Sequence, residues 1–183
     1  MGHTQKQMRE IAAEERSELG LGPRERLDPY ALCKAHGIEV YPLSTLEAGA
    51  AVEHFTSARP TVWSAALIPL DSARIIIEND SHVLERRHSS IAHELGHHLL
   101  EHSFNSVLLG DDHQRQFDAK QEKDATFMAG ELLIPLAAAE RAAFDGWDNA
   151  RAARAFGVSE QFAQMQLKGQ RVRAIRASAK FGR

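Results

Sequence analysis

The chain has 183 residues, of which 43% are hydrophobic and 26% are charged, a balance that is typical of one globular domain and excludes a largely disordered chain. Its net charge of −3 excludes a strongly basic nucleic-acid coat, and its single cysteine, Cys33, excludes a secreted scaffold held by internal disulfides. No apolar run reaches the roughly 18–20 residues that span a bilayer, and the polar N-terminus lacks the apolar segment of a signal peptide. We therefore expect a cytoplasmic protein that does not enter the membrane.

The pattern of apolar residues predicts three strands that precede a long helix, followed by further helices. Helical spacing and end signals, such as Asp28 followed by Pro29, predict helices over residues 4–18, 28–37, 84–101, 114–133, 136–144, 149–156 and 159–168. β-branched and apolar runs predict strands over residues 38–41, 64–70 and 74–78, with a hairpin turn at 71–72. Residues 43–60 and 103–113 are expected to be loops.

The strongest chemical signal is an H-E-x-x-H motif formed by His93, Glu94 and His97. Residues four apart on an α-helix differ by about 40°, so the two imidazoles leave the same face and can bind one ion. Neutral imidazole is a preferred ligand of Zn²⁺, and the adjacent Glu94 can act as a general base on water at the metal. His98 and His102 form a second pair four residues apart, for which we expect solvent exposure or a hydrogen bond behind the metal ligands.

A catalytic zinc site needs a third protein ligand and keeps a fourth position for water. The helix predicted over residues 114–133 offers two carboxylates, Glu122 and Asp124. They lie about 200° apart around a helix, so only one of them should face the metal. The distribution of apolar residues around this helix does not decide between them.

Two motifs in this order resemble the ImmA/IrrE metallopeptidases, a family of small cytoplasmic bacterial zincins. The first is the strand and helix that lead into the H-E-x-x-H motif, and the second is the segment over residues 124–135, which is similar to the family's E-A-N-x-F-A-x-x-L-L-x-P element. The resemblance covers most of the chain. It implies an α+β, minimal zincin-like fold with a small three-stranded twisted sheet packed on helices. We expect a metallopeptidase domain over residues 1–145 and a helical C-terminal extension with a basic tail over residues 146–183.

The resemblance also implies a ligand set and a reaction. It places the third ligand of Zn²⁺ at Asp124, where the family has Glu, and Glu122 remains the alternative. With His93 and His97 as the other ligands and Glu94 as the base, the implied activity is that of a metalloendopeptidase that hydrolyses a peptide bond with water.

The substrate strand is expected to add to the free edge of the sheet at residues 64–70 through backbone hydrogen bonds. A second group that stabilises the oxyanion should exist beside the metal. The candidates for it are His82, His113 and Tyr41.

The resemblance implies a partner as well. Members of the family typically act on a helix-turn-helix repressor, whose removal from DNA induces phage, mobile-element, stress or defence genes. The last 23 residues carry a charge of +6, which makes single-stranded DNA a candidate activator. The alternative function is a non-catalytic, metal-containing regulatory or DNA-sensing module that sequesters a repressor. The intact Glu94 argues against it, because a purely structural metal site needs no base.

Cys33 has two interpretations. It lies in a mostly apolar helix, where a cysteine usually serves as buried packing. Alternatively, its thiolate could bind the zinc ion at the open position and keep the enzyme latent.

Overall fold

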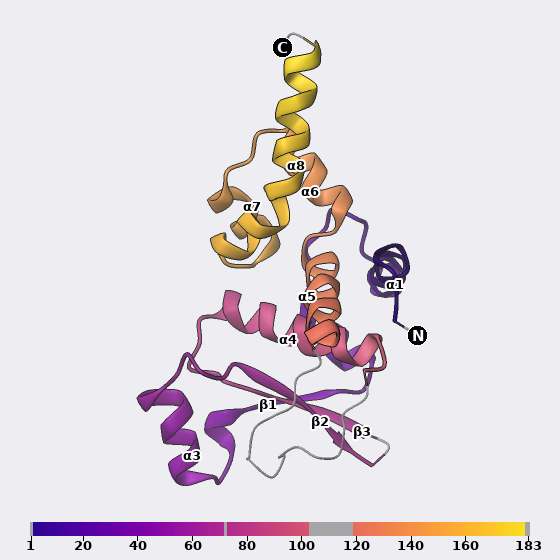
Figure 1. The fold of residues 1–183 in the computed structure, drawn as a ribbon. Coiled ribbons are helices and arrows are strands. Elements are labelled where there is room, and N and C mark those ends of the chain that lie inside the picture. Colours follow the sequence, from indigo (N-terminus) through magenta and orange to yellow (C-terminus); the bar gives the residue numbers. More distant parts are fainter. Residues whose placement is uncertain (1, 72, 103–118, 182–183) are drawn as a thin grey trace.

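The computed structural model describes residues 2–71, 73–102 and 119–181, with a small sheet at one end of the molecule and a group of helices at the other (Figure 1). In chain order its elements are α1 (Gln5–Glu18), α2 (Pro29–Ala35), β1 (Glu39–Pro42), α3 (Gly49–Glu53), β2 (Ala65–Leu70), β3 (Ala73–Glu78), α4 (Leu84–Leu99), α5 (Ala119–Leu133), α6 (Leu136–Phe144), α7 (Asn149–Phe156) and α8 (Glu160–Phe181). A 3-10 turn spans Leu43–Thr45 and a π-helical segment spans His54–Ala58. The α+β, minimal zincin-like class that the sequence predicts is confirmed.

The three strands form a mixed sheet with the order β1-β3-β2. β1 runs parallel to β3, with Val40 opposite Ile76, and β2 runs antiparallel to β3, with Leu67 opposite the same residue. Ile76 is fully buried, as expected for the central strand of a sheet that helices cover. β2 is therefore an edge strand, and it tolerates Pro69 because an edge strand need not donate every N–H to a neighbour.

Several helix ends follow from local sequence signals. Thr4 and Gln7 form a reciprocal capping box at the start of α1, and Asp28 caps the start of α2 through its side chain. Gly157 ends α7 in the left-handed conformation, with φ of 67°. The side chains of Thr4, Gln7 and Asp28 and the backbone N–H of Gly157 pair with backbone groups that a helix leaves unpaired at its ends, and the predicted boundaries are found there.

Two segments differ from the prediction. The expected loop over residues 43–60 contains α3, in which Ala50, Ala51 and Glu53 are residue types of high helix propensity. α8 continues to Phe181, because the residues beyond 168 are mostly good helix formers and a single helical glycine costs only about 1 kcal/mol. The expected loop over residues 103–113, the first residues of the helix predicted from 114, and residue 72 of the hairpin turn lie outside the described residues.

α1 covers α5 and buries an arginine against it. Met8 of α1 lies in the core. The guanidinium of Arg16, which is 2% exposed, donates to the carbonyl of Leu132 near the end of α5 at 2.5 Å, and also to the carbonyls of Gly22 and Glu25. A buried cation is tolerated only when it is hydrogen-bonded, and these carbonyls supply acceptors. Arg16 thus joins α1, the turn after it and the end of α5.

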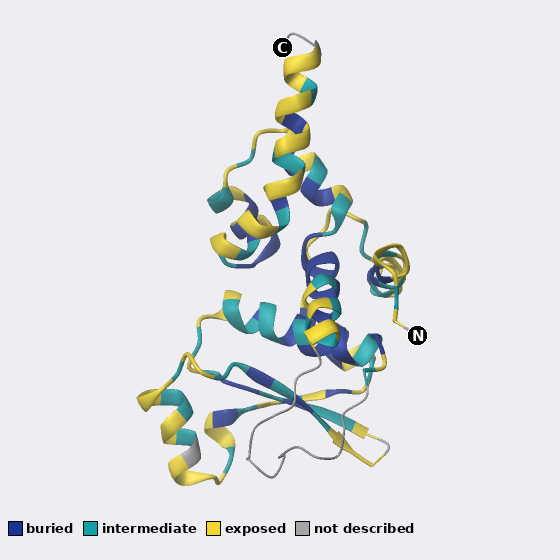
Figure 2. Ribbon diagram, viewed as in Figure 1, coloured by how far each residue is buried: buried dark blue, intermediate teal, exposed yellow. Residues whose placement is uncertain are grey.

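α4 crosses the sheet and packs between it and α5 (Figure 1). Near its start, Arg87 donates Nε and Nη2 to the buried carboxylate of Glu78 in β3 at 3.0 and 2.6 Å, and the hydroxyl of Tyr30 in α2 donates to the same carboxylate at 2.7 Å. Burial, followed by the Glu78 carboxylate, raises the pKa of Tyr30. The three side chains fix α2, β3 and α4 to one another. Figure 2 shows that burial is greatest where α4 and α5 cross.

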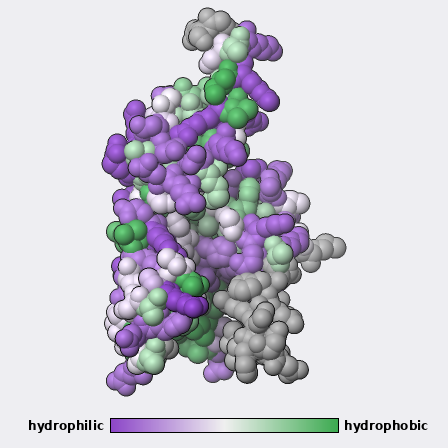
Figure 3. All heavy atoms as spheres, turned by 60° about the vertical axis from the view of Figure 1, so that its left-hand side comes forward, coloured by the Kyte–Doolittle hydropathy of each residue, from purple (hydrophilic) through white to green (hydrophobic). Residues whose placement is uncertain are grey.

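α6, α7 and α8 pack together at the end of the molecule opposite the sheet, and the last turns of α8 extend beyond them (Figure 1). The face shown in Figure 3 is largely hydrophilic with small hydrophobic patches, one of them on the projecting end of α8, where Val172 and Ile175 are exposed. Among the described helices, none is both long and apolar enough to cross a bilayer. The boundary at 145/146 falls in the turn between α6 and α7 and stays a prediction.

Candidate metal centre

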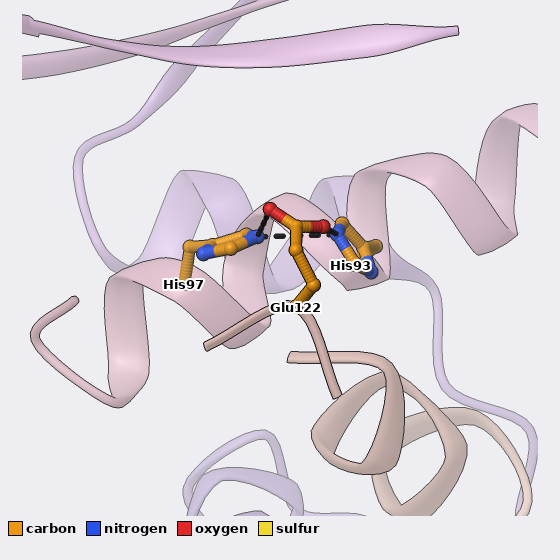
Figure 4. Close-up of side chains that lie close together, drawn as sticks. All are labelled: His93, His97 and Glu122. Atoms are coloured by element: carbon orange, nitrogen blue, oxygen red, sulfur yellow. Dashed lines mark hydrogen bonds and ion pairs between the residues drawn. The ribbon is translucent and has the colours of Figure 1, made fainter. Parts of the chain in front are cut away.

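The two histidines of the H-E-x-x-H motif meet Glu122 where α4 and α5 cross (Figure 4). His93 Nε2 lies 3.1 Å from His97 Nε2, and the carboxylate of Glu122 lies 3.2 Å from the first nitrogen and 3.5 Å from the second. One ligand atom of each residue lies within 4.8 Å of the others. Two imidazole nitrogens and a carboxylate oxygen are the donor set of catalytic zinc sites, so these residues fit a zinc ion, although the same set also suits Mn²⁺ or Fe²⁺.

Glu122, and not Asp124, is the carboxylate that the structure brings to the histidines. Asp124 forms an ion pair with Lys120 at 3.1 Å. The reason is the close approach of α4 and α5 at Gly96, where an added Cβ atom would lie 2.7 Å from the carbonyl oxygen of Ala125. Glu122 lies one helical turn before Ala125 and therefore shares the face of α5 that meets α4, whereas Asp124 is turned away from that face by about 100°. The structure thus brings the alternative, Glu122, and not the expected Asp124, to the two histidines.

The second ring nitrogen of each histidine also has a partner. His97 Nδ1 lies 3.0 Å from His102 Nδ1, and His93 Nδ1 lies 3.5 Å from the hydroxyl of Thr126. Thr126 follows Glu122 by one helical turn, so α5 contributes a carboxylate to one side of the site and a hydroxyl behind it. Partners of this kind hold imidazole ligands in one orientation and one tautomer.

His98 belongs to a different set of contacts. Its Nδ1 lies 2.8 Å from Arg74 Nη1 and its Nε2 lies 3.3 Å from His36 Nδ1, while His36 Nε2 lies 2.6 Å from the carboxylate of Glu15. Burial, followed by the charges of Arg74 and His36, lowers the pKa of His98 to about 4. A neutral His98 accepts a hydrogen bond from Arg74 and connects α4 to β3.

Glu94 lies between α4 and the edge strand. It is 8% exposed, and its Oε2 accepts a hydrogen bond from the N–H of Leu67 in β2 at 2.9 Å. A cavity of about 300 Å³ opens beside Glu94 and His93. The buried carboxylate of the motif is thus held at a fixed orientation next to space that a ligand can enter.

The candidates for an oxyanion-stabilising group have other contacts. His82 Nε2 lies 2.6 Å from the carbonyl of Pro60, and the hydroxyl of Tyr41 donates to Glu39. Neither side chain lines the cavity beside the motif. His113 lies outside the described residues, so this part of the prediction stays a prediction.

Cys33 lies in the hydrophobic core. Its side chain is 1% exposed, and burial raises the pKa of its thiol to about 12. The thiolate that a latent zinc site would need is therefore disfavoured at neutral pH. The structure favours the packing interpretation.

The role of Gly96 cannot be read from the H-E-x-x-H pattern, in which it fills a variable position. A signal for it exists, because glycine inside a helix costs about 1 kcal/mol relative to alanine and usually has a packing reason. Here that reason is the contact with Ala125, which sets the distance between the two helices of the site.

The helix with its H-E-x-x-H motif, the facing carboxylate and the small sheet define a protein of the metallopeptidase type. The sequence profile of the IrrE N-terminal-like domain, a peptidase family, matches residues 33–168. The match covers well over half of the chain, and the chain belongs to this family. No curated protein matches the chain. The resemblance to the ImmA/IrrE family is thereby confirmed.

Proposed function

We propose that the chain is a zinc-dependent endopeptidase with His93, His97 and Glu122 as metal ligands and Glu94 as general base. The observation that carries the proposal is that ligand atoms of His93, His97 and Glu122 lie within 4.8 Å of one another. The buried carboxylate of Glu94 follows His93 directly on α4. Membership of a metallopeptidase family supports it. A bound zinc ion would polarise the scissile carbonyl and lower the pKa of water towards about 7.

Glu94 carries the proton transfer in this proposal. It would accept a proton from the attacking water and return it to the leaving amine. The hydrogen bond from the N–H of Leu67 to Oε2 fixes the orientation of the carboxylate before substrate arrives. A base that is already oriented needs less rearrangement in the transition state.

The outer edge of β2 is the proposed place for the substrate backbone. The N–H of Asn79 donates to the carbonyl of Ser64 at 2.8 Å, so Ser64 and every second residue after it bond towards β3. Ala65 and Leu67 direct their backbone groups to the other side, where the N–H of Leu67 meets Glu94. An extended peptide added to this edge would pass beside the catalytic carboxylate.

We further propose a helix-turn-helix repressor as the substrate and single-stranded DNA as an activator. The substrate class comes from the resemblance to the ImmA/IrrE family. For DNA, the supporting observation is that Lys168 and Arg176 are exposed on α8, whereas Arg171 and Arg173 are hydrogen-bonded to residues of α7 and α6. Exposed cations on a projecting helix can contact phosphates.

The test is the intact mass of a small repressor encoded beside this protein after incubation with the zinc-loaded chain, with and without single-stranded DNA. We expect one discrete cut that is lost in Glu94→Gln and kept in Glu85→Gln, which removes an exposed carboxylate from the same helix. A cut that survives Glu94→Gln would contradict the role of Glu94. Stoichiometric zinc binding without any cut would support the alternative, a non-catalytic metal-containing regulatory module.

A further inference from the structure

The cavity beside Glu94 has side chains that suit one kind of substrate residue. It lies between the start of β2 and the half of α4 that precedes the motif. Beyond His93 and Glu94, the polar side chains in its wall are Ser64, Arg86, Ser89 and Ser90. None of the described residues that line it has a large apolar side chain, in contrast to pockets that select hydrophobic residues.

Arg86 supplies the positive charge of this cavity. Its Nη2 donates to the carbonyl of Thr61 at 3.2 Å and to the hydroxyl of Ser64 at 2.9 Å, which holds the guanidinium at the start of β2. Within the described part of the chain no carboxylate forms an ion pair with Arg86, whereas the adjacent Arg87 is paired with Glu78. The charge of Arg86 and its remaining N–H donors are therefore left for a ligand.

The two serines of α4 do not add hydrogen-bond donors to the cavity. The hydroxyl of Ser89 donates to the carbonyl of Glu85, and the hydroxyl of Ser90 donates to the carbonyl of Arg86, both at 3.0 Å. Their protons are used within the helix, so the hydroxyl oxygens can only accept. Among the described residues of this wall, Arg86 thus supplies the positively charged N–H donors.

Of the described residues that line the cavity, Glu94 alone carries a carboxylate, and this carboxylate opposes an acidic ligand. The Oε2 atom of Glu94 already accepts a hydrogen bond from the N–H of Leu67, which stabilises part of the negative charge of this carboxylate. Arg86 lies on α4 two helical turns before Glu94 and can meet a ligand group that stays away from the catalytic carboxylate.

We propose that this cavity binds a carboxylate side chain of the peptide substrate at a position beside the scissile bond, with Arg86 as the specificity-determining residue. This rests on the peptidase function proposed for the same site. A guanidinium and a carboxylate form charge-assisted hydrogen bonds, which are about twice as strong as neutral ones. Successive side chains of an extended substrate point to opposite faces, so a strand along the outer edge of β2 would direct one of its side chains into the cavity.

A binding experiment tests the proposal without any need for turnover. The zinc-loaded full chain, labelled with ¹⁵N, is titrated with N-acetyl methylamides of glutamate, glutamine, leucine and lysine, and the amide signals of Ala65, Ser89 and Ser90 are followed. We expect the glutamate probe to bind about tenfold more tightly than the glutamine probe, because it adds one charge-assisted interaction. Equal affinity for the two probes would overturn the proposal.

Variants separate the charge of Arg86 from its structural contacts. Arg86→Gln should abolish the preference for glutamate, Arg86→Lys should keep part of it, and Arg176→Gln, which removes the same charge from exposed α8, should not change it. Ser64→Ala removes one acceptor of Arg86 and reports on the fold of this loop. A preference that persists in Arg86→Gln would contradict the assignment.

A peptide library then locates the position in the substrate. Cut sites should share an acidic residue at one fixed position beside the scissile bond, and Arg86→Glu should shift the preference to lysine or arginine. Cleavage without side-chain preference at any flanking position would refute the proposal and leave the peptidase function intact. Failure to cleave any peptide in a Glu94-dependent manner would count against the peptidase function alone, because the binding experiment does not depend on it.

Discussion

Replacement of Glu122 by glutamine should weaken zinc binding far more than replacement of Asp124 by asparagine. The carboxylate of Glu122 lies 3.2 and 3.5 Å from the nitrogens of His93 and His97, whereas Asp124 is paired with Lys120. Each substitution exchanges one carboxylate oxygen for an amide nitrogen, so the two variants are matched in charge and size. The side chain of Glu122 is 36% exposed, and its replacement removes no core contact, so the variant should fold.

The expected magnitudes follow from these contacts. Loss of a residue that only supports a metal ligand lowers metal affinity about 10–100-fold, so loss of a charged ligand itself should exceed roughly 100-fold, or about 2.7 kcal/mol. Asp124→Asn gives up one ion pair with a lysine side chain that is 64% exposed. Such pairs contribute about 0–1 kcal/mol to stability, and zinc affinity should stay within about threefold of the wild-type value.

Competition with a chromogenic zinc chelator at neutral pH measures both affinities. The unfolding temperature with and without zinc is an independent readout, because a metal that binds only the folded state stabilises it by mass action. An inverted result, in which Asp124→Asn loses the affinity and Glu122→Gln keeps it, would refute the assignment drawn from the contact between α4 and α5.

Three further substitutions probe the surroundings of the site. Gly96→Ala would place a methyl group 2.7 Å from the carbonyl oxygen of Ala125. It should lower the free energy of unfolding in urea by about 1–3 kcal/mol and also lower zinc affinity. Unchanged values would contradict the close approach of the helices. Glu78→Gln leaves the charge of Arg87 without its buried carboxylate partner and should lower the free energy of unfolding by about 3 kcal/mol. A decrease below about 1 kcal/mol would show that the ion pair is dispensable. Burial raises the pKa of Cys33 to about 12, so iodoacetamide should modify it only after unfolding. The pKa of Cys33 in the folded protein lies above its value of about 8.5 in the unfolded chain. The contribution of the protonated thiol to the free energy of unfolding is therefore present below about pH 8.5 and is lost as the pH rises towards 12. Cys33→Ala should leave basal activity unchanged, and increased activity would revive the latency hypothesis.

Local signals in the sequence predict most of the elements that carry the site. The H-E-x-x-H spacing places two imidazoles on one face of α4, and the structure brings them together. The bounds predicted for α6 and α7 are found, because Pro135, Asp148 and Gly157 act on the backbone within a few residues of their own positions. Features of this kind depend on interactions that are close in sequence.

The choice between Glu122 and Asp124 depends on a contact that the sequence does not encode locally. Both residues fit the helical pattern of α5, and the face that meets α4 is set by Gly96 and Ala125, which belong to different helices. The same limit applies to the sheet, since the strand runs predict three strands but not the parallel pairing of β1 with β3. Pairings between distant segments decide the geometry of the centre, and they require the folded structure.

The hydrogen bond from Arg16 to Leu132 spans 116 residues of sequence. During synthesis on the ribosome, α1 is translated long before α5. The apolar face of α1 and the side chain of Arg16 therefore cannot be buried until α5 has been made. The helix that carries Glu122 is in turn held at its far end by α1, which precedes the region shared with the family. Closing so long a loop has an entropic cost that only the completed core offsets. A nascent chain should therefore acquire its metal late, after α5 has been translated and the first helix has docked on it.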